Sequence, residues 1–293
     1  MRSWGASRWI AVAAIAVLAV VVGALAFAAY QRANPEPTPA EPGPVPSFDL
    51  GVQTQTPTPT APAAVPVALD AQRYLSVGGE QWWRATAGAC NGPAPVVERS
   101  PDGGQTWVDV TPTYRGIAQV QSLDAFSAQD AEMVAALAGC ETQALRTYTN
   151  GEFWESYPDV LAASRYVNPT DAATVVLPSG PVAAPCAQAS GLRASGDTVA
   201  VLCDGRAWNR ADTQWLQLAP ENAIALTLDG SDVIVAHTAP DCAGVAVSRA
   251  TPESSPPVAC AEGVDAAVPT AIDLAGSDLY LWSADSLVTV PIP

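Results

Sequence analysis

The sequence contains no lysine, and all 13 of its basic residues are arginine. The absence of lysine excludes the lysine of a phosphate-binding P-loop and any Schiff-base chemistry. The chain carries 29 acidic residues against those 13 basic ones, for a formal net charge of −16. Because nucleic-acid phosphates would be repelled by such a surface, the composition argues against nucleic-acid binding.

Histidine is almost absent as well, since His237 is the single one. The chain also has no C-x-x-C pair and no G-x-S-x-G motif. These absences argue against a zinc or redox site and against Ser-His-Asp catalysis. No loop has the dense alternating acids of a calcium site, so we expect Asp197, Asp232 and Asp278 to form turns. We therefore predict no metal site, no cofactor and a structural or surface role for His237.

Long apolar runs are confined to the amino terminus. Residues 9–30 contain 22 uncharged, mostly apolar positions, enough for a helix to cross a bilayer. Arg2 and Arg8 precede them, and the positive-inside rule then leaves residues 1–8 in the cytoplasm. We predict a single-pass signal anchor, with the rest of the chain outside the membrane. The alternative is a cleaved signal peptide, with "ALA" at 24–26 or "AFA" at 26–28 as the cleavage site.

Residues 31–66 are predicted to be a Pro/Thr-rich linker. Ten of residues 33–66 are proline, and such a segment favours extended polyproline II structure over a packed core. The linker leaves residues 67–293 as one extracytoplasmic domain. We expect it to act either as a flexible spacer or as a stalk that lifts the domain through the cell envelope.

Six cysteines follow the linker, and an even number outside the cytoplasm indicates disulfide bonds. Fifteen pairings are possible. The nearest-neighbour pairing is the working hypothesis: Cys90–Cys140, Cys186–Cys203 and Cys242–Cys260.

A weak repeat runs through the domain, in which a short strand, a Gly/Asp turn and an apolar β-prone run follow one another. It occurs six times, at residues 74–88, 125–139, 165–180, 192–205, 226–239 and 272–285. Residues 128–138 have the propensity of a short helix, but their place in the repeat predicts a hairpin. Six hairpins favour an all-β fold, a propeller of about five to six degenerate blades. A β-sandwich is the alternative, and "AVPVAL" (64–69) is predicted to close the ring against "SLVTVPI" (286–292).

The octapeptide "SPDGGQTW" at residues 100–107 resembles the Asp-box, or BNR repeat, Ser/Thr-x-Asp-x-Gly-x-Thr-Trp. All five defined positions match: Ser100, Asp102, Gly104, Thr106 and Trp107. Two further stretches are eroded copies: "TYTNGEFW" keeps Thr147, Gly151 and Trp154, and "VLCDGRAW" keeps Gly205 and Trp208. The resemblance implies that each box forms the turn between the two outer strands of a propeller blade. It also implies that the tryptophan packs between neighbouring blades.

Asp-boxes occur both in sialidases, which are six-bladed glycosidases, and in non-enzymatic propellers that resemble photosystem II assembly factors. A sialidase would need a Phe/Tyr-Arg-Ile-Pro motif, and Arg73 before Tyr74 lacks that context. The resemblance therefore implies a non-catalytic module that binds an envelope protein or a glycan. The alternative is a diverged sialidase-like glycoside hydrolase, which would need two carboxylates at the site. We expect Trp82 and Trp83 to serve packing, with a carbohydrate platform as the alternative. In the central pocket, clustered arginines or paired carboxylates would favour the enzyme, and a small apolar lining would favour the scaffold.

Overall fold

The structure is a computed structural model that describes residues 20–27, 67–78 and 81–293. The chain forms two compact units, residues 1–56 and 57–293. In the first unit, residues 20–27 form a helix. Across the described ranges, no helix combines the length and the apolar character needed to cross a membrane. Residues 9–19 and 28–30 of the predicted anchor and the whole predicted linker lie outside the described residues.

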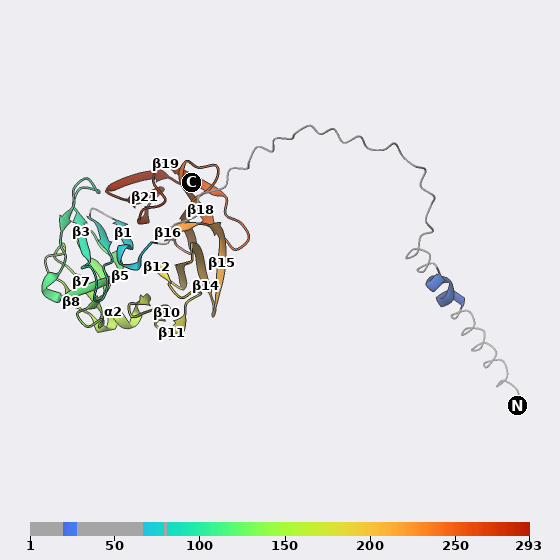
Figure 1. The fold of residues 1–293 in the computed structure, drawn as a ribbon, viewed down its shortest axis with the longest axis horizontal. Coiled ribbons are helices and arrows are strands. Elements are labelled where there is room, and N and C mark those ends of the chain that lie inside the picture. The colour runs from blue at the N-terminus through green and yellow to red at the C-terminus, as the bar shows by residue number, and fades with distance from the viewer. Residues whose placement is uncertain (1–19, 28–66, 79–80) are drawn as a thin grey trace, which may run out of the picture. The chain divides into compact units, whose positions relative to one another are not determined.

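Six antiparallel sheets follow one another along the second unit and form the six blades of a β-propeller (Figure 1). Each blade is built from strands that are consecutive in the sequence. The first strand of each blade lies nearest the central channel of the ring. Blade 1 contains β1 (Arg73–Gly78), β2 (Gln81–Thr86), β3 (Val96–Ser100) and β4 (Val108–Asp109). Blade 2 contains β5 (Ile117–Ala125), β6 (Ala131–Leu137), β7 (Thr142–Thr147) and β8 (Glu155–Ser156). Blade 3 has three strands: β9 (Tyr166–Asn168), β10 (Asp171–Leu177) and β11 (Gly180–Ala183).

The carboxy-terminal half repeats the arrangement. Blade 4 contains β12 (Ser190–Ser195), β13 (Thr198–Cys203), β14 (Arg206–Ala211) and β15 (Gln214–Glu221). Blade 5 contains β16 (Ala223–Asp229), β17 (Asp232–His237), β18 (Gly244–Ala250) and β19 (Pro257–Glu262). Blade 6 has three strands: β20 (Thr270–Ala275), β21 (Asp278–Ser283) and β22 (Ser286–Pro291).

The six hairpins predicted from the repeat are confirmed, and each joins the first two strands of one blade. Residues 131–137 form β6, so the hairpin reading of that stretch is confirmed over the helical one. Gly196, Gly230 and Gly276 adopt positive φ values of 55°, 61° and 64° in three of these turns. A hairpin turn needs this backbone conformation, and glycine adopts it without a steric penalty. The β-sandwich alternative is wrong.

In the described part of the second unit, three short helices lie outside the blades: η1 (Leu69–Ala71), η2 (Thr113–Arg115) and α2 (Pro158–Ala163). The sequence did not predict α2, because six residues are too few to show a helical period. Pro158 occupies the first turn of α2. The N–H that a proline lacks would have no hydrogen-bond partner within the helix at this position. α2 connects blade 2 to blade 3 and lies between β8 and β10 in Figure 1.

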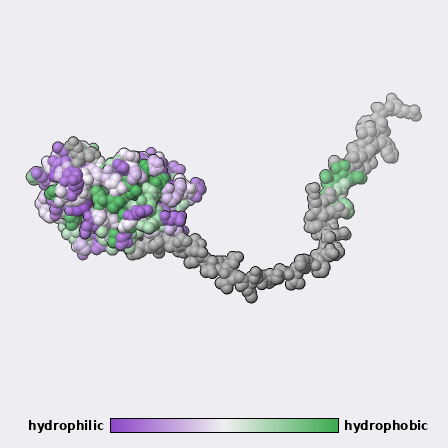
Figure 2. Space-filling view, turned by 90° about the horizontal axis from the view of Figure 1, so that it is seen from above, coloured by the Kyte–Doolittle hydropathy of each residue, from purple (hydrophilic) through white to green (hydrophobic). Residues whose placement is uncertain are grey.

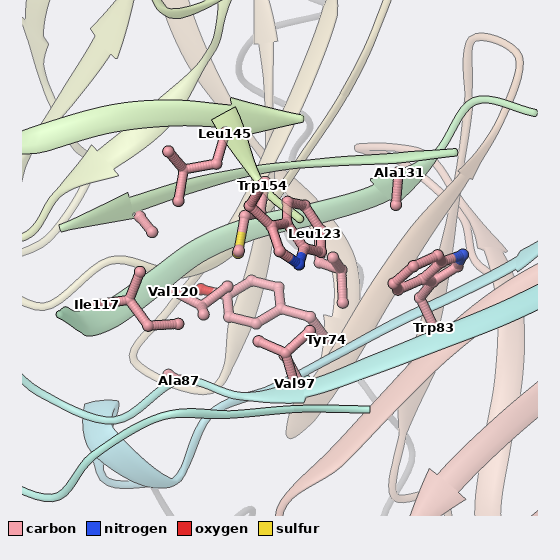
Figure 3. Close-up of a cluster of buried hydrophobic side chains, with 13 residues drawn as sticks. Tyr74, Trp83, Ala87, Val97, Ile117, Val120, Leu123, Ala131, Leu145 and Trp154 are labelled. Carbon is pink, nitrogen blue, oxygen red and sulfur yellow. The ribbon is translucent and has the colours of Figure 1, made fainter. Parts of the chain in front are cut away.

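The core is divided among the interfaces between blades. Buried apolar clusters join blades 1 and 2, 3 and 4, 4 and 5, 5 and 6, and 6 and 1. In the cluster between blades 1 and 2, Trp83 and Trp154 meet edge to face with ring centroids 5.8 Å apart (Figure 3). Among the described residues, the junction of blades 2 and 3 has no comparable cluster, and α2 lies there instead.

Within the described residues, the predicted exchange of strands at the closure of the ring is not found. Val67–Ala68 have no regular structure, and Leu69 begins η1. β22 pairs with β21 alone among the described strands, so the predicted pairing of residues 67–69 with 286–292 is wrong. Residues 64–66 lie outside the described part. Blades 6 and 1 are held instead by an apolar cluster that includes Leu75 and Trp282.

Two of the three predicted disulfide bonds are confirmed, Cys186–Cys203 and Cys242–Cys260, with Cα–Cα distances of 5.6 and 5.8 Å. The first ties the β11–β12 connection to β13, and the second ties the β17–β18 connection to β19. The pairing of Cys90 with Cys140 is corrected, because both are free thiols. They are neighbours nonetheless: burial and the Cys140 thiol raise the pKa of Cys90 to about 12.

Blade 6 has no fourth strand, so β22 is its outermost strand. The side chains of Val288 and Val290 on β22 are partly buried and pack on the core of blades 5 and 6. Figure 2 views the molecule from the side on which β19 and β21 lie in Figure 1, and it shows apolar surface between hydrophilic areas.

Candidate functional site

The two faces of the propeller differ in what they expose. We call the face at which the innermost strands begin the N-face, and the face at which they end the C-face. The chain enters the ring at the N-face, where Val67 and Gln72 line a small cavity of about 40 Å³ with the first residues of β12, β16 and β20. The C-face holds a much larger cavity of about 460 Å³.

Five polar residues near the ends of innermost strands surround the channel at the C-face. We call them the channel ring: Ser76, Asp124, Arg193, Thr227 and Asp273. Four of them occupy the third position from the end of their strand, and Asp124 occupies the second position from the end of β5, which contains β-bulges. The sequence analysis missed them, although four of the five lie three residues before the glycine of a predicted hairpin.

Asp273 links three blades through its two carboxylate oxygens. Its Oδ2 accepts the Val77 backbone N–H at 2.8 Å, and its Oδ1 accepts the Thr227 hydroxyl at 2.9 Å. Desolvation raises the pKa of Asp273, and Arg193 and these hydrogen bonds oppose that rise. The carboxylate therefore joins blade 6 to blades 5 and 1.

Arg193 crosses the channel from blade 4. Its Nη2 donates to the Leu75 carbonyl at 2.8 Å, and its Nη1 lies 3.7 Å from Asp124 Oδ1. The side chain of Arg193 is 12% exposed and that of Asp124 is 56% exposed. Asp124 therefore lines the wall of the cavity, and the desolvation that raises its pKa comes from the protein around it. It presents a carboxylate to the cavity that Arg193 only partly neutralises.

The C-face cavity extends from the channel ring across the junction of blades 2 and 3. Glu132 and Arg146 line it from blade 2, and Asp159 and Val160 line it from α2. Glu132 Oε2 accepts two hydrogen bonds from Arg146, from Nε at 2.9 Å and Nη2 at 2.6 Å. This ion pair fixes the guanidinium at the cavity wall and raises the pKa of Arg146. The cavity thus occupies the junction at which the apolar core is weakest.

Three aromatic side chains stand next to Arg146, and we call them the aromatic rim: Phe126, Tyr148 and Tyr157. Ring centroids are 5.7 Å apart for Phe126–Tyr148 and 6.2 Å apart for Tyr148–Tyr157. The Arg146 guanidinium lies 5.0 Å from the Phe126 centroid and 5.8 Å from that of Tyr157. Phe126 and Tyr148 are 44% and 50% exposed, which leaves large apolar rings in water beside a polar cavity. Exposed apolar surface of this kind marks interaction sites in soluble proteins.

The octapeptide at 100–107 forms the turn between β3 and β4, the two outer strands of blade 1. Asp102 Oδ1 accepts the Ser100 hydroxyl and the Thr106 N–H, both at 2.8 Å, and Oδ2 accepts the Thr106 hydroxyl at 2.6 Å. These bonds lower the pKa of Asp102 to about 2. A Cβ on Gly104 would come within 2.5 Å of Leu287, so the turn approaches blade 6 closely. Trp107 is half-buried there, under the Arg84 guanidinium at 4.1 Å.

The stretch 147–154 forms the corresponding turn between β7 and β8 of blade 2. Thr147 Oγ1 accepts the Gly151 N–H at 3.0 Å, and Thr149 Oγ1 accepts the Phe153 N–H at 2.9 Å. Trp154 is 1% exposed and packs against blade 1. The stretch at 201–208 differs, because Asp204 and Gly205 form the turn between β13 and β14, the second and third strands. Gly205 and Trp208 therefore do not form an outer-strand turn, and that assignment is corrected.

Trp82 and Trp83, expected to serve packing with a carbohydrate platform as the alternative, both pack against other side chains. Trp83 is fully buried between blades 1 and 2, and Trp82 packs edge to face on Tyr280 at 4.5 Å. His237 is buried too, with Nε2 2.9 Å from the Ser248 hydroxyl and Nδ1 3.1 Å from the Thr238 carbonyl. Burial lowers the pKa of His237. Ser248 is fully buried, so no substrate reaches this pair.

Three arginines and four carboxylates line the C-face cavity together, which is the lining expected of an enzyme. The small apolar lining expected of a scaffold does not occur in this cavity. Within the described ranges, no three or more His, Cys, Asp or Glu side chains are grouped to hold a metal ion. The chemistry available is hydrogen bonding by charged groups of both signs.

No protein-family model matches the sequence, and no curated protein matches it. Solved structures with a similar fold include YCF48 bound to a D1 peptide, with 14% identity, a TM-score of 0.43, and coverage of 75% of this chain and 77% of that one. YCF48 from Cyanidioschyzon merolae is similar at 13% identity and a TM-score of 0.32, over 74% of this chain and 66% of that one. The Aleuria aurantia lectin in complex with α-methyl-L-fucoside is similar at 9% identity and a TM-score of 0.42, over 79% and 97%. These similarities concern the fold alone.

Proposed function

We propose that this protein is a membrane-tethered, extracytoplasmic β-propeller that binds an envelope component at its C-face without chemical turnover. Residues 9–30 would hold it in the membrane and residues 31–66 would form the linker. The two disulfide bonds support an oxidising compartment outside the cytoplasm. The turns at 100–107 and 147–154 support the Asp-box resemblance through their place in the blade and their hydrogen bonds.

The observation that carries the proposal is the combination of an open C-face cavity with an exposed aromatic rim. The cavity of about 460 Å³ has the size of a small-ligand site. The chain enters the ring on the opposite face, at Val67 and Gln72. A ring face presented to a ligand is the usual way in which such scaffolds are used.

A glycoside hydrolase is the second candidate, because the raised pKa values of Asp124 and Asp273 suit a general acid. Both oxygens of Asp273, however, accept hydrogen bonds that join blades, and Glu132 is committed to Arg146. By this count Asp124, Asp159 and the Oε1 atom of Glu132 keep free oxygens. Hydrolysis needs a matched pair of carboxylates, and we favour binding because Asp273 and Glu132 are both held by structural bonds.

The test uses the full-length chain, purified in a detergent without a sugar headgroup and immobilised. Wild type should retain a component of a solubilised envelope fraction, and Asp124→Asn should retain markedly less of it. Asp204→Asn is the matched control on the N-face, since Asp204 is exposed and its left-handed backbone suits asparagine. Hydrolysis of a fluorogenic glycoside panel by wild type, lost in Asp124→Asn, would overturn the non-catalytic proposal.

A further inference from the structure

We infer that the C-face cavity binds a neutral oligosaccharide, and that the aromatic rim stacks on one of its sugar rings. The inference rests on the proposed binding function and names its ligand class. Three features carry it: the charge balance of the cavity, the hydrogen-bonding groups that face it, and the continuity between cavity and rim.

The charges in the cavity are of both signs and nearly balance, because three arginines and four carboxylates line it. Glu132 is bound to Arg146 at 2.6 Å, and Arg193 interacts with the carboxylates of both Asp124 and Asp273. The cavity therefore offers an ionic ligand little excess charge of one sign, although the whole chain is strongly acidic. The cavity therefore selects for hydrogen bonding rather than for ligand charge.

The same charged groups suit a ligand whose polar groups each donate and accept hydrogen bonds. Carboxylates such as Asp124 only accept hydrogen bonds, and guanidiniums such as Arg146 only donate them. A sugar hydroxyl does both, so adjacent hydroxyls can bridge a carboxylate and a guanidinium at once. Asp124 is the most available acceptor, because more than half of its side chain remains exposed to the cavity.

Arg146 joins the cavity to the aromatic rim. Its guanidinium lines the cavity and also lies over Phe126 and near Tyr157, so the polar wall continues into the rings. The faces of a sugar ring carry C–H groups that pack on aromatic rings while its hydroxyls point sideways. An oligosaccharide would then contact Asp124 in the cavity with one sugar unit and the aromatic rim with another. A charged peptide side chain would use one part of this surface and leave the other unsatisfied.

The experiment measures binding of the full-length chain, in the same sugar-free detergent, to an array of neutral gluco-, manno-, galacto-, arabino- and chito-oligosaccharides. Wild type should bind at least one class. Tyr148→Ala should weaken that binding by about tenfold, the order expected for one lost aromatic contact. Tyr148→Phe should restore most of the loss, because it keeps the ring. Asp124→Asn should weaken binding by a similar factor through loss of the charged acceptor.

Phe153→Ala is the matched control, since Phe153 is an exposed aromatic residue on the same turn as Tyr148 but outside the rim. It should bind like wild type, and all variants should unfold at temperatures close to that of wild type. Sugar binding that Tyr148→Ala and Asp124→Asn leave unchanged would overturn the site.

The failures of the two proposals are distinguishable. Failure of the whole array, together with capture of an envelope protein that Asp124→Asn abolishes, would sink the oligosaccharide inference and leave the binding function standing. Failure of both the array and the envelope fraction would overturn the binding function as well.

Discussion

The turns at 100–107 and 147–154 occupy the same place in blades 1 and 2 but are stabilised differently. Both start with a fully buried hydroxyl, of Ser100 or Thr147, that accepts the N–H of a glycine four residues later. Both glycines have similar φ values, 85° and 87°. The first turn then adds a carboxylate network around Asp102, while the second has only the Thr149 hydroxyl in that position.

The turn with fewer polar bonds has the more buried tryptophan. Trp154 is 1% exposed and contacts Trp83, whereas Trp107 is half-buried beneath Arg84. The comparison shows that polar bonds within the turn and apolar packing between blades can substitute for one another. The buried hydroxyl and the left-handed glycine are the features that the two turns share.

The largest expected effect follows from replacing the buried indole of the second turn. Trp154→Ala should lower the free energy of unfolding by about 3–5 kcal/mol, because it leaves a large cavity between blades 1 and 2. Trp107→Ala should cost about 1–2 kcal/mol, since it removes a partly buried ring and one cation–π contact. Denaturant unfolding of both variants measures the difference, and equal losses would contradict the compensation between the turns.

Removing the shared hydroxyl should have an intermediate effect. Ser100→Ala and Thr147→Val each leave a glycine N–H without its partner, which costs about 1–3 kcal/mol in a buried setting. Ser100→Ala should be the more damaging, because Ser100 also donates to Asp102. The same unfolding assay applies. A neutral result for either variant would show that the hydroxyl is dispensable.

Lowering the pH should destabilise the turn at 100–107, because the pKa of Asp102 is lowered in the folded state. Folding lowers this pKa from 3.8 to about 2, so the ionised form stabilises the folded state. That stabilisation is present above the unfolded value and is lost as the pH falls through the folded value. The melting temperature of wild type should therefore drop more steeply than that of Asp102→Asn between about pH 4 and pH 2. Parallel curves would show that Asp102 makes no ionic contribution to the turn.

The smallest effect is a gain. Thr149→Asp should stabilise blade 2 by about 0.5–1 kcal/mol, because a carboxylate can accept the Phe153 N–H and the Thr147 hydroxyl together. The Phe153→Thr change, added to it, supplies the hydroxyl that Thr106 supplies in the first turn. Thermal melts of the single and double variants measure the gain. Destabilisation by Thr149→Asp would mean that the second turn does not tolerate the carboxylate.

The local parts of the fold could be predicted from the sequence. Turn glycines and alternating strands predicted all six inner hairpins, since a hairpin is encoded within about 15 residues. Closure of the ring could not be predicted, because Asp273, Val77 and Thr227 meet across three blades and share no local signal. The stretch at 201–208 was wrongly assigned to an outer turn, because Gly and Trp at the Asp-box spacing also suit the turn between the second and third strands of a blade.

The candidate site was missed for a related reason. Arg193 and Asp124 lie 69 positions apart in the sequence, and only the ring brings them together. The aromatic rim combines a hairpin tip, an outer turn and the residue before α2, none of which has a motif. A polar residue three positions before each hairpin glycine was the available signal for the channel ring. The packing role expected for Trp82 and Trp83 follows from strand alternation, since Trp83 is buried and Trp82 packs on Tyr280.

Hydrogen–deuterium exchange of the full chain, with and without a solubilised envelope fraction, tests the central claim most directly. Binding at the C-face predicts slower exchange in residues 122–134, 146–165 and 192–195, with residues 67–72 of the N-face unchanged. Protection confined to the N-face or to the outer strands of the blades would contradict the account.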